Sequence, residues 1–145
     1  MISIHKAGEA DMPWILELER ENFAPPWTHG SLLSEIFNSN TFFAIARVDG
    51  RNLGFIILRQ TVDTGELLQI AVEKSARRQG VATALLKAAL QFAKAGQITS
   101  AFLEVREGNE AARAFYEKQN FRTMRVRKDY YMAPVEDAVE MAKGL

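Results

Sequence analysis

The stretch that decides the fold reads Ile70-Ala71-Val72-Glu73-Lys74-Ser75-Ala76-Arg77-Arg78-Gln79-Gly80-Val81-Ala82-Thr83. It begins as a short β-branched strand, continues through a basic turn that contains Gly80, and opens a long helix. The first N–H groups of a helix have no partner within the helix and lie at the positive end of its dipole. We therefore expect this turn to bind an anion such as a pyrophosphate group.

The composition is that of a soluble globular protein, with 48% hydrophobic and 25% charged residues in a chain of 145 residues. This length is typical of one domain, and we expect a single domain over residues 1–145. No apolar run approaches the roughly 20 residues that a membrane span needs, and the N-terminus lacks the apolar region of a secretory signal. These features predict a cytoplasmic protein that does not contact a membrane.

Several kinds of chemistry are disfavoured by what the sequence lacks. There is no cysteine, so disulfides, thiolate metal sites and thiol nucleophiles are excluded. His5 and His29 alone offer little for a zinc site or a Ser-His-Asp triad, and we expect no metal. The basic turn also lacks the lysine of a Walker A loop and the three glycines of a dinucleotide fingerprint, which argues against nucleotide hydrolysis and hydride transfer.

The charges are unevenly distributed although the net charge is zero. Residues 1–40 contain six acidic and two basic residues, so this segment has a net charge of −4 and the remainder has +4. An acidic part and a basic part would suit a cationic substrate and an anionic cofactor, although solvated faces without a partner are equally compatible. The zero net charge argues against a general nucleic-acid-binding protein.

The hydrophobic pattern predicts the element order β-α-α-β-β-β-α-β-α-β-β. The expected strands begin near Ile2 and cover residues 41–48, 53–60, 65–72, 98–105, 121–127 and about 135–141. The expected helices cover residues 9–22, a segment capped by Thr28, about 80–95, and 110–119 with Asn109 as its N-cap. This order predicts an α/β fold with one mixed sheet and helices on both faces.

A second motif lies downstream and comprises Leu103-Glu104-Val105-Arg106, Asn109 and Phe115-Tyr116-Glu117. Together with the Arg-x-x-Gly-x-Ala turn, it resembles the GNAT superfamily of acetyl-coenzyme A-dependent N-acetyltransferases over nearly the whole chain. The segments 23–28 and 127–131 are similar to those of the RimI type, which acetylates the N-terminal alanine of the eighteenth small-subunit ribosomal protein. The resemblance implies the GNAT acyl-CoA N-acyltransferase fold.

The resemblance also implies where acetyl-CoA binds: in a V-shaped opening between the strand that ends at Val72 and the strand that ends near Val105. The cofactor-binding residues that it implies are Ile70, Ala71 and Val72 through their backbone, Arg77, Arg78, Gln79, Gly80, Val81, Ala82 and Thr83 around the pyrophosphate, and Asn109.

Two side chains are implied to be catalytic. Glu104 lies near the C-terminal end of its predicted strand, where ligands enter open α/β sheets. Alternation places it with Ile98, Ser100 and Phe102 on a face that we expect to be mostly apolar, which could raise its pKa. The resemblance implies that Glu104 is the general base, acting through water, and that Tyr116 is the general acid that protonates the departing thiolate. A surface ion pair of Glu104 with Arg106 and a core position for Tyr116 are the alternatives.

The acceptor implied by the resemblance is the free N-terminus of a protein, most simply a ribosomal protein. We expect Trp27, Tyr130 and Tyr131 to wall the channel that admits it, although Trp27 could equally be a core residue. Three other functions stay open: acetylation of lysine side chains or a small amine, a non-catalytic coenzyme A-binding module, and an RNA- or ribosome-binding protein that uses residues 122–128.

Overall fold

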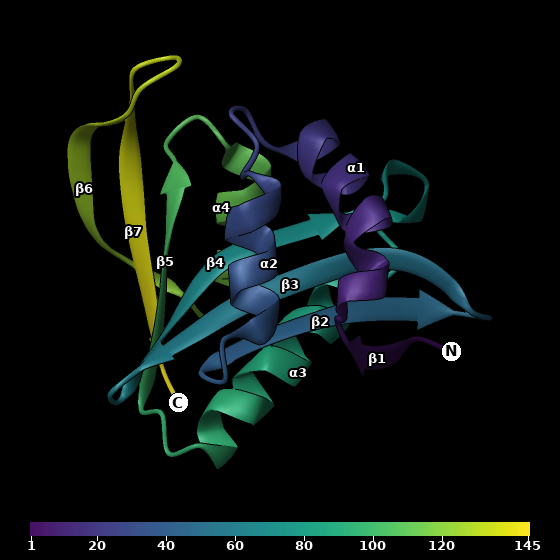
Figure 1. Cartoon of the computed structure of the whole chain (residues 1–145). Coiled ribbons are helices and arrows are strands. Elements are labelled where there is room, and N and C mark those ends of the chain that lie inside the picture. Colours follow the sequence, from purple (N-terminus) through teal and green to yellow (C-terminus); the bar gives the residue numbers. More distant parts are fainter.

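The helices and strands expected from the sequence are all present in the computed structural model, which describes residues 1–145 (Figure 1). The strands are β1 (Ser3–Lys6), β2 (Thr41–Val48), β3 (Arg51–Thr61), β4 (Thr64–Val72), β5 (Ser100–Arg106), β6 (Arg122–Tyr131) and β7 (Glu136–Gly144). The α-helices are α1 (Met12–Asn22), α2 (His29–Phe37), α3 (Val81–Ala95) and α4 (Glu110–Lys118). Short 3-10 helices cover Glu9–Asp11 and Lys74–Ala76.

The strands form one seven-stranded mixed sheet in the order β1-β2-β3-β4-β5-β7-β6, which confirms the predicted fold class. Helices α1 and α2 pack on one face and α3 and α4 on the other (Figure 1). Each face has its own hydrophobic core: Ile15, Leu18 and Leu32 belong to the core under α1 and α2, and Leu85 and Leu86 belong to the core under α3. No helix is both long and apolar enough to cross a bilayer.

Two of the boundaries that differ from the sequence prediction change the description of the site. The helix expected over residues 9–22 begins as a 3-10 turn, in which the Asp11 carboxylate accepts a hydrogen bond from the Gly8 N–H at 2.8 Å. The strand expected to end at residue 127 continues to Tyr131, because β6 regains pairing with Glu136 of β7 after an irregular segment. Tyr130 and Tyr131 therefore lie at the end of a strand.

The sheet opens between its two central strands. β4 and β5 form a parallel pair only over Thr64–Leu67 and Ser100–Leu103. Beyond these residues β4 continues beside β3 to Val72, and β5 continues beside β7 to Arg106. The backbone of β4 beyond Leu67 thus has no strand partner on the side of β5. This separation gives the sheet the expected V-shaped opening beyond Leu67.

Candidate active site

The basic turn precedes α3 and presents the start of that helix without a side-chain cap. Gly80 is the N-cap residue and has φ +82°, and Arg78 has φ +63°. A Cβ atom at Gly80 would meet nothing within 4 Å, so glycine is required there by the backbone conformation and not by space. The first N–H groups of α3 are therefore free to bind an anion, as the sequence predicts.

A cavity of about 500 Å³ lies at this turn, between the start of α3 and one side of α4. Its lining residues are Val72, Ala76, Arg77, Arg78, Gly80, Val81, Ala82, Thr83, Ala111, Ala114, Phe115, Lys118 and Gln119. The N–H groups of α3 with Arg78 and Lys118 suit the phosphates of coenzyme A, and the apolar side chains suit its pantetheine arm. The cavity therefore fits the implied cofactor.

The predicted cofactor residues are not all in the cavity wall. Ile70, Ala71, Gln79 and Asn109 are absent from it. The Gln79 amide donates to the Ser75 carbonyl at 3.2 Å, and the Asn109 side chain caps α4 by accepting from the Ala112 N–H at 3.2 Å. Contacts of these four residues with the cofactor stay predictions.

The sequence analysis missed the wall that α4 supplies. Ala111, Ala114, Phe115 and Lys118 all face the cavity from this helix. Their spacing of three or four residues places them on one side of the helix, and this periodicity is the signal that could have identified them.

Gly80→Ala should weaken acetyl-CoA binding about five- to tenfold, because an alanine in the left-handed region is strained by roughly 1 kcal/mol and pulls the turn away from its anion-binding shape. Isothermal titration calorimetry with acetyl-CoA measures this effect. Gly50→Ala is a matched control, since Gly50 also has a positive φ of +76° and open space around it but lies in the β2–β3 turn. Equal loss of affinity in both variants would contradict the role of the Gly80 turn.

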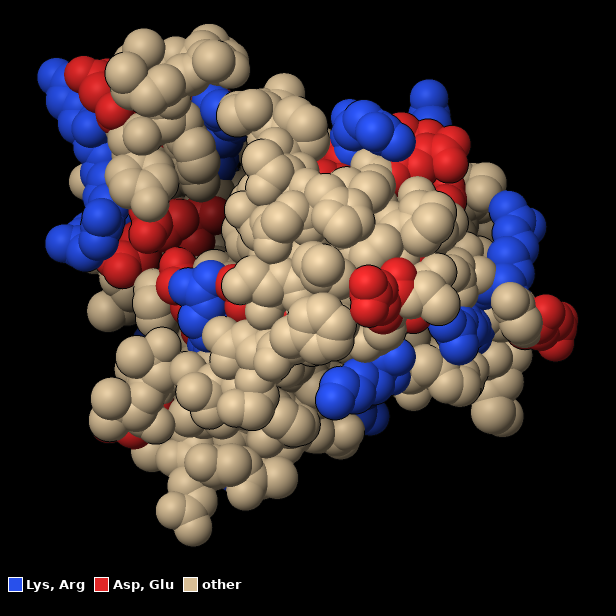
Figure 2. All heavy atoms as spheres, in the orientation of Figure 1, with Lys and Arg blue, Asp and Glu red and all other residues tan.

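The opposite face of the sheet has an acidic hollow. Figure 2 shows acidic atoms gathered in the depression between the β6–β7 hairpin and the two N-terminal helices. Glu66 of β4, Glu104 of β5 and Glu140 of β7 are mutually close enough for their charges to influence one another. Glu104 directly follows Leu103, the last residue of β5 that pairs with β4, and so lies where the two strands separate.

The prediction that Glu104 has mostly apolar surroundings is wrong, because charged residues lie close to it. Ile98 precedes β5 and packs in the core under α3, on the other face of the sheet. The Glu104 side chain is 14% exposed, and its Oε2 atom lies 3.9 Å from Nε of Arg127. Both atoms are buried, and neither has a hydrogen-bond partner. The alternative pairing with Arg106 is also absent, because Arg106 pairs with Glu136 at 3.1 Å.

Glu66 is a functional candidate that the sequence analysis did not identify. Burial raises its pKa, the nearby charges of Arg59 and Arg127 lower it, and those of Glu104 and Glu140 raise it. Glu140 is paired with Arg125 at 2.5 Å, whereas Glu66 forms no ion pair. A charged residue within the otherwise apolar stretch 65–72 was the signal available in the sequence.

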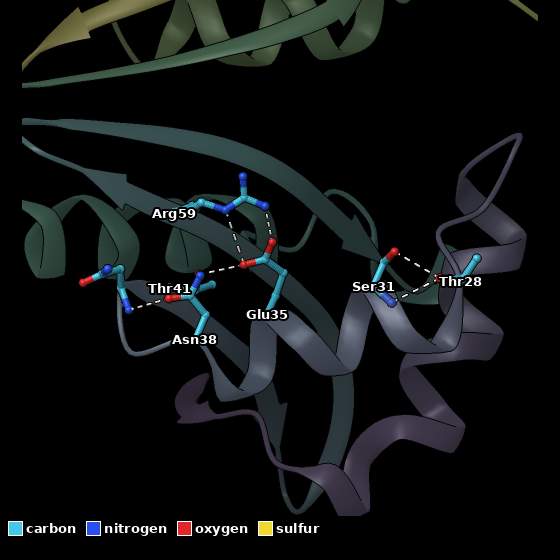
Figure 3. Close-up of polar contacts among 7 residues, drawn as sticks. Thr28, Ser31, Glu35, Asn38, Thr41 and Arg59 are labelled. Carbon is cyan, nitrogen blue, oxygen red and sulfur yellow. Dashed lines mark hydrogen bonds and ion pairs between the residues drawn. The ribbon is translucent and has the colours of Figure 1, made fainter.

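Helix α2 forms one side of this region and is fixed to the sheet by a buried acid. Glu35 pairs with Arg59 of β3 and accepts a hydrogen bond from the Thr41 hydroxyl at 2.8 Å (Figure 3). Burial raises the pKa of Glu35, but the hydrogen bonds from Arg59 and Thr41 outweigh it and lower the pKa overall. Thr28 caps the helix by accepting from the Ser31 N–H at 3.1 Å, as predicted.

Tyr116 of α4 lies on the cofactor side of the sheet and is 7% exposed. Its ring packs edge-on against Phe115 and Phe121, at centroid distances of 5.3 and 5.8 Å. Burial raises the pKa of the Tyr116 hydroxyl well above its usual value, and Tyr131 raises it further. The hydroxyl is therefore a weaker acid than that of an exposed tyrosine, and its role as a proton donor stays a prediction.

The two tyrosines of β6 lie beside the acidic hollow. Their rings are 5.1 Å apart, and the Arg106 guanidinium lies 4.4 Å from the centre of the Tyr131 ring. Burial and then the charge of Glu104 raise the pKa of Tyr131 to about 12. Tyr131 in turn contributes to the raised pKa of Tyr116.

Trp27 lies on the other side of the hollow. It is half-buried against the core under α1 and α2 and lines a pocket of about 530 Å³ together with Glu35 and Arg59. Trp27 thus packs partly against the core, and its role in walling an acceptor channel stays a prediction.

The comparisons with known proteins agree with this geometry. The family model described as acetyltransferase (GNAT) family matches residues 12–121. An N-acetyltransferase of Methanocaldococcus jannaschii is 32% identical over 97% of this chain and 90% of its own length. The ribosomal protein bS18-alanine N-acetyltransferase of Escherichia coli is 30% identical over 98% of this chain and 97% of its own. A crystal structure of the E. coli ribosomal-protein-S18-alanine N-acetyltransferase has a TM-score of 0.90 at 29% identity and covers 99% of this chain and 94% of that chain.

An uncapped helix start beside a cavity, together with an acidic hollow where β4 and β5 separate, is the arrangement expected of an acyl-CoA-dependent transferase. The chain belongs to the GNAT acetyltransferase family, and the expected resemblance is confirmed. It is an acetyl-CoA-dependent N-acetyltransferase.

Proposed function

We propose that the protein transfers the acetyl group of acetyl-CoA to the N-terminal α-amino group of another protein. The observation that supports this most is the position of Glu104, in an acidic hollow on one side of the sheet opening while the cofactor cavity lies on the other. A peptide N-terminus in the hollow would meet the thioester without displacing the cofactor. The reaction is then a direct transfer within a ternary complex.

The acidic hollow favours a cationic acceptor, and the preference for one kind of amine over another follows from their pKa values. An α-amino group with a pKa of about 7.7–8.0 is roughly a quarter to two-fifths neutral at pH 7.5, whereas a lysine with a pKa of about 10.4 is neutral about one time in a thousand. The difference corresponds to some 3.5 kcal/mol. When the base is a glutamate acting through water, this difference favours an N-terminus over a lysine.

The proposed roles follow the positions of the groups. Glu104 accepts the ammonium proton through a water molecule, and the amine attacks the acetyl carbonyl. Backbone groups of β4 near Val72, which have no partner on the side of β5, polarise that carbonyl. Tyr116 gives a proton to the departing sulfur, and the second proton that the acceptor nitrogen loses as the amide forms restores the tyrosine hydroxyl. Acetyl-CoA supplies the activated thioester, and the chain supplies orientation and proton transfer.

The acceptor that we propose is the N-terminal alanine of ribosomal protein bS18. The support for this is the E. coli relative that carries this activity in its name and aligns with 98% of the chain. Trp27 on one side of the hollow, and Tyr130 and Tyr131 on the other, would wall the channel for a thin, extended N-terminus. We expect no direct contact with nucleic acid.

Mass spectrometry of acetylated peptides tests this function. Two peptides with the N-terminal sequence of bS18, each containing a lysine and differing only in a free or a blocked N-terminus, are incubated with acetyl-CoA. We expect acetylation of the free N-terminus and none of the blocked peptide. Exclusive lysine labelling would overturn the proposal, and consumption of acetyl-CoA without an acetylated product would favour a non-catalytic module.

A further inference from the structure

The carboxyl group of Glu19 forms hydrogen bonds that connect three segments on the proposed acceptor side of the molecule. Glu19 of α1 is 0% exposed. Its Oε2 atom accepts a hydrogen bond from the Trp27 backbone N–H at 2.9 Å and another from the Gln69 side-chain amide at 2.8 Å. Helix α1, the loop between α1 and α2, and strand β4 are thus connected at Glu19.

The two hydrogen-bond partners of Glu19 lie at the sheet opening and at the pocket beside α2. Gln69 is in the part of β4 beyond Leu67, where the strand has separated from β5 and the sheet is open. Trp27 lines the pocket of about 530 Å³ beside α2. Glu19 therefore sets the distance between the strand at the reaction centre and the loop that walls the acceptor side.

Burial and hydrogen bonding act in opposite directions on the pKa of the Glu19 carboxyl. Oε1 of Glu19 and Oε1 of Gln69 are both buried without a partner, and both are acceptors when Glu19 is ionised. Burial raises the pKa of Glu19, and the hydrogen bonds from Trp27 and Gln69 lower it by less. A proton on Glu19 removes the cost of a buried charge and supplies a donor where the site has only unpaired acceptors.

We propose that Glu19 is a positioning residue for the acceptor: through its two hydrogen bonds it holds the Trp27 loop against β4 and thereby sets the affinity for the acceptor amine. It does not touch the reacting atoms. The inference rests on the proposed function in one respect, that the acceptor enters on the face that carries this loop. The cofactor cavity lies on the other face, between α3 and α4, and Glu19 is not among the residues that line it.

Steady-state kinetics of three variants test the proposal. Glu19→Ala leaves the Trp27 N–H and the Gln69 amide without their acceptor, and we expect the acceptor KM to rise about tenfold while kcat and the acetyl-CoA KM stay within about twofold. Glu19→Gln should restore wild-type values, because its amide oxygen can accept from both partners and its nitrogen can donate. Glu17→Ala is the matched control, since Glu17 is an exposed acid on the same helix, and it should behave as wild type.

A substitution in β4 tests the same hydrogen-bonded connection from its other side. Gln69→Leu removes one partner of Glu19 and should raise the acceptor KM in the same direction, and the double variant with Glu19→Ala should be no worse than Glu19→Ala alone. Circular dichroism and acetyl-CoA binding report whether each variant is folded. If Glu19→Ala does not fold, Gln69→Leu and Glu19→Gln still carry the test.

The proposal is overturned if the acetyl-CoA KM rises as much as the acceptor KM, or if Glu19→Gln is as impaired as Glu19→Ala. It is also overturned if the folded variants keep the wild-type acceptor KM. All assays use whichever amine the wild-type enzyme acetylates. The position of the acetyl group on the wild-type product tests the proposed function, and the kinetics of the variants test the role of Glu19.

Discussion

Replacement of Glu104 by glutamine should lower kcat by about 10²- to 10³-fold, because the amide cannot accept the proton that the acceptor ammonium must lose. Acetyl-CoA affinity should stay at its wild-type value, since the cofactor cavity lies on the other face of the sheet. Stopped-time assays of product formation with saturating acceptor measure the first effect, and calorimetry measures the second.

The control for this substitution is Glu107→Gln. Glu107 immediately follows β5, is exposed, and carries the same charge, so its replacement should leave kcat unchanged. A Glu104→Gln enzyme that is folded and turns over at the wild-type rate would show that another group, with Glu66 as the first candidate, accepts the proton.

Tyr116→Phe should have the second largest effect, a fall in kcat of about 10²-fold with unchanged acetyl-CoA affinity. The phenyl ring keeps the packing against Phe115 and Phe121, so the loss reports on the hydroxyl. A thioester of a more acidic thiol should narrow the difference from wild type, because such a leaving group needs less protonation.

Thermal unfolding separates this role from a structural one. The Tyr116→Phe variant should unfold within a few degrees of wild type, since only one hydroxyl is removed from a packed ring. A large drop in unfolding temperature together with lost activity would place Tyr116 in the core without a catalytic role. The same drop in kcat with every thiol leaving group would argue against proton donation to sulfur.

The elements of the fold were predictable because each carries its own local signal. The strand at 64–72, the anion-binding turn and the helix from Val81 follow one another in sequence, and their boundaries depend on alternation, glycine conformation and helical periodicity. The N-caps Thr28 and Asn109 were predictable too, because each side chain accepts a hydrogen bond from an N–H only three residues later. Tertiary contacts reinforce these signals and do not oppose them.

The surroundings of Glu104 were not predictable from the same signals. They depend on β7 lying between β5 and β6, which brings Glu140 and Arg127 to the face of Glu104. Such neighbours come from strands distant in the sequence, and alternation within one strand cannot reveal them. Glu66 was missed because the acidic residues near it, Glu104 and Glu140, come from other strands. Glu19 was missed because an acid on an amphipathic helix is expected at the surface until its buried partners are known.

The central claim is that cofactor and acceptor approach from opposite faces of the sheet and meet where β4 and β5 separate. A crystal structure with a bisubstrate analogue, in which a peptide N-terminus is joined covalently to the acetyl group of coenzyme A, tests it directly. We predict the coenzyme A part in the cavity at Gly80 and the peptide between α2 and the β6–β7 hairpin, with the junction in the opening beyond Leu67 and beside Glu104. A peptide bound on the same face as the coenzyme, or a junction remote from Glu104, would contradict the account.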